Sequence, residues 1–373
     1  MTTPSHPPTH STSRRNFLRR GVLGGSAALA APALATAQGR TVTWRVETFM
    51  PGGAGLQAFR AWCASIIEKT EGALAFEAYD PSNSDSGLDI YLAASSGQRE
   101  AVHASTIYSQ RLFPAGVFLS SYPMAMRANA EWDVFYYALG GLEITRELFA
   151  RQGLYFIGPV HHGPNIIHSK KPIYRVDDFR GLRMRMPGGM VADLFKSLGS
   201  EVVSLPGSQI FGALQRGEID AADYVGPAVN YDLGFSKETD FISLGPPGYM
   251  SVYQPVDLTD ITARLDAWQA LSPQLRFFLE NEVQAFSNAH HAAIQKADQE
   301  AWAKFDAEGT RVIRLSSEDV RVMTNAALPI WVEYAKRDPD SARLFKIQLD
   351  YMTSGSLGYV EKVLADIISA DLL

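Results

Sequence analysis

Apolar and polar positions follow a regular pattern between residues 178 and 235. From Leu182 to Met186, apolar residues alternate with two arginines, and a Pro-Gly-Gly sequence ends this extended run. Apolar residues then recur at helical spacing from Met190 to Leu198, where Gly199 supplies a stop. The pattern continues with a strand at 201–205, a helix at 208–216 and a strand at 219–225. Such alternation of strands with amphipathic helices predicts an α/β fold with a parallel sheet.

Polar side chains of this unit fall at the carboxyl ends of its strands. Arg185 ends the first strand and Asp223-Tyr224 ends the third, whereas Arg183 lies nearer the start of its strand. Ligands of parallel sheets bind beyond these carboxyl ends. A planar guanidinium stays charged and matches a carboxylate with two parallel hydrogen bonds, so Arg185 is a candidate carboxylate clamp. The alternative interpretation is a salt-bridged surface arginine on an edge strand.

Similar patterns predict further elements on both sides of this unit. Strands are expected at 41–49, 74–79, 154–158 and 310–315, and helices at 55–70, 88–96, 132–150 and 316–338. The region 261–308 reads as a long helix broken at Ser272-Pro273. His290-His291 lies on a polar face of this helix, and we expect it to be solvated. Two helices are expected within 341–373.

Composition excludes several classes of protein. The chain has 373 residues, 46% hydrophobic and 20% charged, which suits two globular domains and excludes disorder. A formal net charge of -6 gives no indication of nucleic-acid binding. The lone Cys63 allows neither an internal disulfide nor a thiolate metal site.

The amino terminus has the features of a cleaved export signal. Arg14-Arg15 is followed by Phe17-Leu18, a weakly apolar run rich in Gly and Ala, and small residues at Ala35 and Ala37. Twin arginines before such a run are typical of the twin-arginine (Tat) pathway. We therefore predict a signal peptide at 1–37 and a periplasmic protein. The alternative is a disordered basic tail.

Motifs of catalysis are absent from the sequence. It contains no G-x-S-x-G, no glycine-rich phosphate loop, no H-E-x-x-H and no cysteine pair. His161 and His162 are adjacent, so their side chains point apart on an extended chain and do not suggest a zinc site. No catalytic residue is predicted, and the protein is not expected to be an enzyme. An exported enzyme remains the alternative from another class of function.

Two spaced motifs resemble a known family. The runs GLRMRMP (181–187) and LPGSQIFGALQRGEIDAADYVGP (205–227) resemble the solute receptors of tripartite ATP-independent periplasmic (TRAP) transporters. The most similar subgroup binds 2-oxo and 2-hydroxy monocarboxylates. This resemblance implies a two-domain periplasmic-binding-protein fold with mixed, mainly parallel sheets, a long bracing helix and a hinge cleft.

The resemblance also implies a ligand site. The arginine two residues before the proline, here Arg185, would bind the ligand carboxylate. Asp223 and Tyr224 stand where the subgroup has Glu-Trp, and Asn165 lies near the position of an amide that touches the ligand or a cation. Tyr249 and Tyr108 are candidates for the walls of the site, because they fall in its ligand-side loops.

A bound cation is a weaker expectation. No organic cofactor is implied, but members of the subgroup carry a metal-binding glutamate in the segment that corresponds to residues 249–254. That segment, YMSVYQ, holds no carboxylate, which puts a bridging sodium or calcium ion in doubt. Asp223 would be its acidic ligand, and Asp257 could contribute if the register shifts.

The resemblance gives a division of the chain. Domain I would comprise 38–160 with a returning segment at about 225–255, and domain II would comprise 161–224 with a segment at about 310–340. The long helix at 256–309 would span both domains, and 341–373 would form C-terminal helices that could exchange in a homodimer. The receptor would capture a small organic acid by hinge closure and deliver it to a TRAP permease in the membrane. A sensory protein on the same fold is a further alternative.

Overall fold

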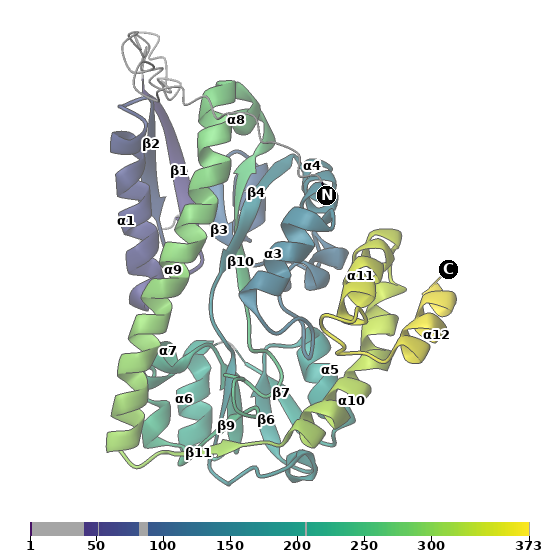
Figure 1. Cartoon of the computed structure of the whole chain (residues 1–373). Helices are drawn as coiled ribbons and strands as arrows, with labels where there is room; N and C mark the ends of the chain where they lie inside the picture. Colours follow the sequence, from purple (N-terminus) through teal and green to yellow (C-terminus); the bar gives the residue numbers. More distant parts are fainter. Residues whose placement is uncertain (2–40, 51, 82–88, 206, 373) are drawn as a thin grey trace.

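A computed structural model describes residues 1, 41–50, 52–81, 89–205 and 207–372 of the chain. The predicted twin-arginine signal at 1–37 therefore lies outside the described residues apart from Met1. The described part folds into two α/β lobes, each built on its own sheet (Figure 1). Within it, no helix is long and apolar enough to cross a membrane.

The first lobe contains a five-stranded sheet with the order β2-β1-β3-β10-β4. Its strands are β1 (Val42–Thr48), β2 (Leu74–Tyr79), β3 (Ala101–Ala104), β4 (Leu154–His161) and β10 (Leu258–Arg264). β2, β1 and β3 run parallel, whereas β10 is antiparallel to both of its neighbours. The helices of this lobe are α1 (Gly53–Lys69), α2 (Ile90–Ser95), α3 (Asn129–Ala138), α4 (Gly141–Ala150), α8 (Leu265–Ala270) and the short turns η1 (Thr106–Tyr108) and η2 (Pro114–Phe118).

The second lobe contains a six-stranded sheet with the order β11-β9-β5-β8-β6-β7. Its strands are β5 (Ile166–Ser169), β6 (Arg183–Met186), β7 (Glu201–Ser204), β8 (Ala221–Tyr224), β9 (Phe241–Leu244) and β11 (Arg311–Arg314). Its helices are α5 (Gly189–Ser197), α6 (Gly207–Gln215), α7 (Pro227–Asp232) and the turns η3 (Val176–Phe179) and η4 (Phe235–Lys237). β7, β6 and β8 are parallel. The predicted strand-helix unit is therefore confirmed, and its carboxyl ends share one edge.

Three segments connect the sheets along the described chain. The first runs from β4 to β5 through residues 162–165, and the second from β9 to β10 through residues 245–257. The third is α9 (Pro273–Ala307), a 35-residue helix that extends along both lobes (Figure 1). This brace agrees with the predicted fold class.

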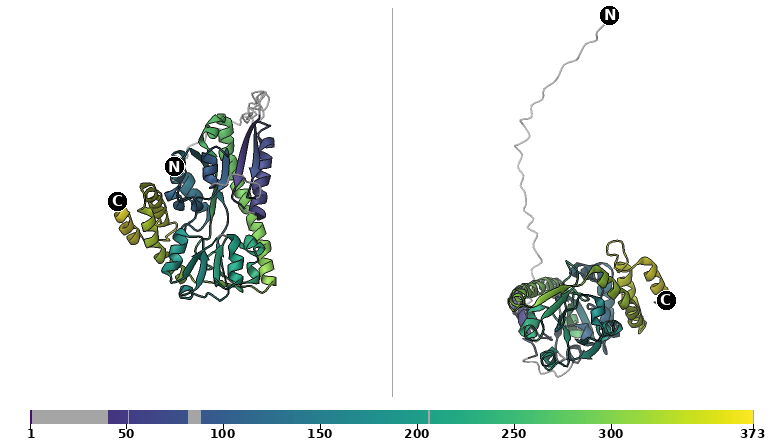
Figure 2. Two further views of the ribbon diagram at one scale, coloured as in Figure 1. Left: turned by 180° about the vertical axis from the view of Figure 1, so that it is seen from behind. Right: turned by 90° about the horizontal axis from the view of Figure 1, so that it is seen from below.

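The C-terminal helices pack on the side of the molecule opposite α9 (Figure 2). α10 (Ser317–Ala335) contacts α5 of the second lobe, and α11 (Pro339–Met352) contacts α3, α4 and η2 of the first. α12 (Lys362–Leu372) lies against α10 and α11 of the same chain. Trp331 and Phe345, both fully buried, join the apolar cores of the two lobes in one cluster.

Three sequence-based predictions are wrong in this region of the fold. The return to domain I does not occur at 225–255, because β9 pairs within the second sheet and the chain rejoins the first sheet only at β10. β10 also replaces the first part of the helix expected at 256–309. The single helix expected at 132–150 is two helices, since Gly140 adopts a left-handed conformation with φ of 87° between α3 and α4.

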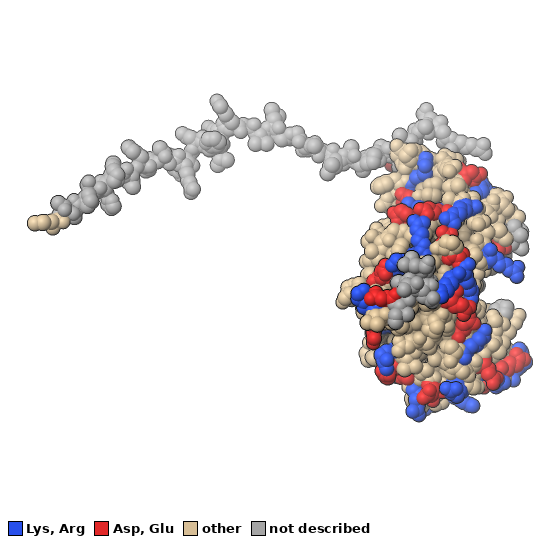
Figure 3. All heavy atoms as spheres, turned by 90° about the vertical axis from the view of Figure 1, so that its right-hand side faces the viewer, with Lys and Arg blue, Asp and Glu red and all other residues tan. Residues whose placement is uncertain are grey.

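His290 contradicts a fourth expectation. It is fully buried, and its ring nitrogen Nδ1 lies 3.0 Å from the main-chain oxygen of His161. The polar face of α9 at this point therefore packs on the first connection between the lobes and is not solvated. On the face shown in Figure 3, basic and acidic side chains are interspersed, consistent with the small net charge.

Candidate functional site

Arg185 is buried at the carboxyl edge of the second sheet, with only 4% of its surface exposed. Its Nε donates to the carbonyl oxygen of Leu205 (2.9 Å) and its Nη1 to that of Asp223 (2.6 Å). Nη2 makes no hydrogen bond to the described residues, so one side of the guanidinium can still donate. Arg183, on the same strand, has a side chain that is 43% exposed and pairs with Asp220 through two hydrogen bonds of 3.0 Å. The salt-bridged surface arginine is thus Arg183, whereas Arg185 is held by main-chain carbonyls.

Asp223 lies beside this guanidinium. Its Oδ2 is 3.5 Å from Arg185 Nη1, and its Oδ1 accepts a hydrogen bond from the hydroxyl of Tyr253. Burial raises the pKa of Asp223 to about 7, although Arg185 and the Tyr253 hydrogen bond oppose this effect. Because the carboxylate is destabilised by burial, Asp223 cancels only part of the arginine charge near neutral pH.

Tyr224 forms an aromatic wall next to the arginine. The guanidinium carbon of Arg185 lies 5.3 Å from the centre of the Tyr224 ring, a cation–π distance. Gly207, at the start of α6, makes room for this ring, because a Cβ added there would lie 2.4 Å from the Tyr224 hydroxyl oxygen. The parallel strands β6 and β8 therefore bring together the arginine, the carboxylate and the aromatic residue predicted from the sequence.

Asn165 lies in the first connection between the lobes and pairs with Gln254 in the second. The two residues form an isolated β-bridge, and Asn165 Nδ2 donates to Gln254 Oε1 (2.9 Å). Gln254 Nε2 in turn donates to the carbonyl oxygen of Ser121 in the first lobe (2.6 Å). Asn165 Oδ1 is buried and has no hydrogen-bond partner. The sequence did not predict Gln254, because no local pattern indicates which residue an amide pairs with across two connections.

Asp257, at the end of the second connection, is close to Asp223 and Asn165. Burial raises the pKa of Asp257 to about 7, and the charge of Asp223 raises it further, whereas hydrogen bonds from the Leu258 main chain and from Asn165 lower it. One buried and one partly buried carboxyl group therefore accompany the buried arginine. Sequence reasoning considered Asp257 only as an alternative cation ligand.

The two tyrosines predicted as walls have different positions. Tyr108 is 59% exposed in surface area, yet the protein around its hydroxyl and the charge of Asp257 raise its pKa, while the charge of Arg185 lowers it. Tyr108 belongs to the first lobe, where its ring packs on Phe49, and its hydroxyl is within electrostatic range of Arg185. Tyr249 instead accepts a hydrogen bond from Arg127 Nη1 (3.1 Å) and has no contact with Arg185 among the described residues.

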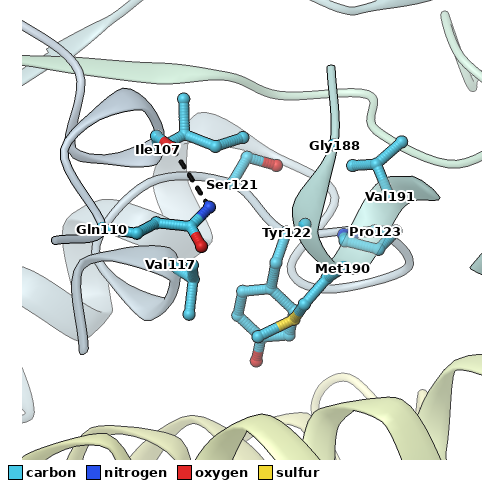
Figure 4. Close-up of a pocket in the computed structure, with 10 residues that line it drawn as sticks. Ile107, Gln110, Val117, Ser121, Tyr122, Pro123, Gly188, Met190 and Val191 are labelled. Atoms are coloured by element: carbon cyan, nitrogen blue, oxygen red, sulfur yellow. Dashed lines mark hydrogen bonds between the residues drawn. The ribbon is translucent and has the colours of Figure 1, made fainter. Parts of the chain in front are cut away.

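A pocket lies between residues of the two lobes (Figure 4). Its walls come from the segment after β3 in the first lobe and from the start of α5 in the second: Ile107, Gln110, Val117, Ser121, Tyr122, Pro123, Gly188, Gly189, Met190 and Val191. The pocket is a narrow crevice with room for about one water molecule. Arg185, Asp223 and Tyr224 are not among the residues that line it.

The fit of a cation can be judged from the oxygen atoms present. Asp223, Asp257 and the unpartnered Asn165 Oδ1 are candidate ligands, and hard cations prefer such oxygens. However, Asp223 already accepts from Tyr253 and pairs with Arg185. In the described ranges, no three His, Cys, Asp or Glu residues are grouped as a metal site. The residues do not form a complete cation site, and the prediction of Asp223 as a metal ligand stays a prediction.

The molecule has two lobes joined by extended connections and a long helix, and a buried arginine lies at the carboxyl edge of one sheet. This arrangement is typical of two-lobed solute-binding receptors. Comparison with known sequences gives the particular family. The pattern of the bacterial extracellular solute-binding proteins of family 7 matches residues 52–338, and the chain belongs to this family.

Individual relatives agree with this assignment. A monocarboxylate 2-oxoacid-binding periplasmic protein of Nostoc is 28% identical over 302 residues, which cover 80% of each chain. The crystal structure of a TRAP solute-binding protein from Colwellia psychrerythraea, with bound calcium and pyruvate, is 21% identical with a TM-score of 0.74 and covers 86% of this chain and 99% of that one. One from Bordetella bronchiseptica, with calcium and picolinate, is 23% identical with a TM-score of 0.73 and covers 90% and 99%. These structures confirm the predicted fold.

Proposed function

We propose that this protein is an extracytoplasmic receptor that binds a small organic monocarboxylate, with 2-oxo and 2-hydroxy acids as the preferred class. The observation that carries the proposal is the geometry of Arg185. Its guanidinium is buried, oriented by two main-chain carbonyls, and left with Nη2 free of hydrogen bonds to the described residues. A carboxylate that bonds there would gain a charge-assisted interaction in surroundings with little water.

The neighbouring residues support a small ligand with one carboxylate. Tyr224 provides an aromatic surface beside the guanidinium, and Tyr108 of the other lobe lies within electrostatic range of it. Asp223 and Asp257 would disfavour a second carboxylate close to them, because like charges repel in a buried site. The described ligands of the relatives, namely 2-oxoacids, pyruvate and picolinate, share this single carboxylate.

Closure of the lobes would complete the site. The arginine belongs to the second lobe and Tyr108 to the first, so a ligand between them contacts both only when the lobes approach. The loaded receptor would then deliver its ligand to a TRAP permease and would perform no chemical reaction itself. Export by the twin-arginine route and a homodimer formed through 341–373 belong to the same proposal, and sedimentation analysis of the mature protein tests the dimer.

Isothermal titration calorimetry of the purified mature protein tests the ligand class. Pyruvate, 2-oxobutanoate and lactate should bind with a 1:1 stoichiometry, and succinate should bind more weakly. Failure of all monocarboxylates to bind would refute the proposal. Turnover of these acids, or a visible chromophore in the purified protein, would support the alternative of an exported enzyme.

A further inference from the structure

Asp223 is a potential competitor for the guanidinium that would hold the ligand. Its side chain is almost fully buried, and its Oδ2 lies 3.5 Å from Arg185 Nη1. A carboxylate and a guanidinium readily form two parallel hydrogen bonds, so an unrestrained Asp223 could pair with Nη1 and Nη2 together. Such a pair would occupy the donor that the ligand needs.

The observed hydrogen bonds keep Asp223 from this double pairing. Arg185 Nη1 donates to the main-chain oxygen of Asp223 (2.6 Å) and not to its carboxylate, and Nη2 has no hydrogen bond within the described ranges of the chain. Carboxylate Oδ1 accepts from the hydroxyl of Tyr253. This bond directs Oδ1 away from the arginine, so the carboxylate approaches the guanidinium through Oδ2 alone.

Tyr253 is fixed from outside the strands that carry Arg185 and Asp223. It lies fully buried in the second connection between the lobes, and its ring packs edge-on against Phe195 of α5, with 5.3 Å between the ring centres. Its main-chain oxygen accepts from the N–H of Met124 in the first lobe (2.7 Å). The position of the hydroxyl is therefore set by contacts that do not involve the Asp223 side chain.

We propose that Tyr253 is a positioning residue, which turns the Asp223 carboxylate away from Nη2 of Arg185 and so keeps this donor available to the ligand. The inference rests on the proposed function, because it assumes that the arginine binds the ligand carboxylate. Without the Tyr253 hydroxyl, the buried Oδ1 loses its donor, and the arginine supplies the replacement. The ligand then has to displace an internal carboxylate before it can bind.

Tyr253→Phe tests this role, with pyruvate as the probe in calorimetric titrations. The change removes the hydroxyl and keeps the ring that packs on Phe195. Pyruvate binding should weaken about 10- to 100-fold, the range expected for the loss of a hydrogen bond to a charged group.

Tyr91→Phe provides the matched control. Tyr91 is also fully buried, and its hydroxyl also donates to a buried carboxylate, that of Asp260 in the core of the first lobe. Its substitution should lower the unfolding temperature but leave pyruvate affinity at the wild-type value. The comparison separates the general cost of losing a buried hydroxyl from an effect on the arginine.

Asp223→Asn distinguishes positioning from a purely structural role of Tyr253. An amide carries no charge that competes for the guanidinium, so Asp223→Asn should bind pyruvate about threefold more tightly than the wild type. Adding Tyr253→Phe to Asp223→Asn should then change the affinity less than threefold, whereas a structural role would weaken binding in both backgrounds alike. The double variant leaves no buried carboxylate without its donor, so it can be measured even if Tyr253→Phe alone does not fold.

Three results would overturn the inference. They are wild-type affinity in a folded Tyr253→Phe, a loss of tenfold or more when Tyr253→Phe is added to Asp223→Asn, and weaker pyruvate binding in Asp223→Asn alone. The last result would mean that the carboxylate itself contributes to the site, for example as a ligand of a bridging cation. In each case pyruvate binding by the wild type leaves the proposed function in place, whereas failure of the wild type to bind any monocarboxylate refutes that function itself.

Discussion

Replacement of Arg185 by alanine is the most direct test of how this receptor would hold an organic anion. The change removes the buried guanidinium and with it the donors to Leu205 and Asp223. It also removes Nη2, the donor proposed for the ligand. We expect Arg185→Ala to abolish measurable binding of monocarboxylates.

The size of the effect follows from the burial of the side chain. Truncation of one partner of a buried, hydrogen-bonded charge pair costs about 2–5 kcal/mol, which corresponds to a loss of affinity between about 30-fold and several thousandfold. The guanidinium is only 4% exposed, so water and salt screen it weakly and the loss should fall in the upper part of this range. Arg185→Lys should keep part of the affinity, because an ammonium supplies charge without two parallel donors.

Arg183→Ala is the matched control, since it removes the same side chain from the same strand. Its guanidinium is paired with Asp220 at the protein surface, away from the carboxyl edge. Calorimetric titration with pyruvate and 2-oxobutanoate should therefore give wild-type affinity for Arg183→Ala. A thermal melt without ligand checks that each variant is folded. If Arg185→Ala is folded and binds within threefold of the wild-type affinity, the proposed clamp is wrong.

Three further perturbations test other parts of the structure. Gly207→Ala should weaken ligand binding more than it lowers the unfolding temperature, because the added Cβ would displace the end of the Tyr224 ring; unchanged affinity would remove this ring from the site. Burial raises the pKa of Asp260 to about 7, so the stability of the wild type should fall between pH 4 and 7 as Asp260 ionises in the unfolded chain but not in the folded one. Asp260→Asn removes this ionisation, and from pH 4.5 to pH 7.5 its free energy of unfolding in urea melts should rise relative to that of the wild type by on the order of 3 kcal/mol. Dialysis against EDTA in sodium-free buffer should leave carboxylate affinity unchanged, since Asp223 is already bonded to Tyr253; a tenfold loss restored by calcium or sodium would instead assign a bridging cation.

The part of the site that lies within one strand-helix unit could be predicted from the sequence. Alternation in β6 and helical spacing in α5 are local signals, and parallel strands place their carboxyl ends at one edge. Arg185, Asp223 and Tyr224 therefore come together as expected. The roles proposed for them as ligand contacts stay predictions.

The remaining residues depend on contacts between distant segments. β10 contains the buried polar residues Thr259, Asp260 and Thr262, and each has a hydrogen-bond partner in the fold: Thr259 bonds His103, and Asp260 accepts from Tyr91 and Thr262. Burial of polar residues becomes acceptable once such partners exist, and the sequence does not reveal them. For the same reason, the burial of Gln254 could not be foreseen.

The connections between the lobes determine where closure can occur. His290 and His291 of α9 donate from Nδ1 to the main-chain carbonyl oxygens of His161, the last residue of β4, and His162, the first residue of the connection, at 3.0 and 2.8 Å, because a carbonyl oxygen can only accept. Burial lowers the pKa of His290 to about 4, so this ring stays neutral and keeps its bond near pH 7. Two turns further along α9, Asp298 Oδ1 accepts from the main-chain N–H of Ala228 in the second lobe (2.9 Å). α9 is thus attached to both lobes within about two turns, so we predict that closure would bend the helix between His291 and Asp298 and rotate the two extended connections.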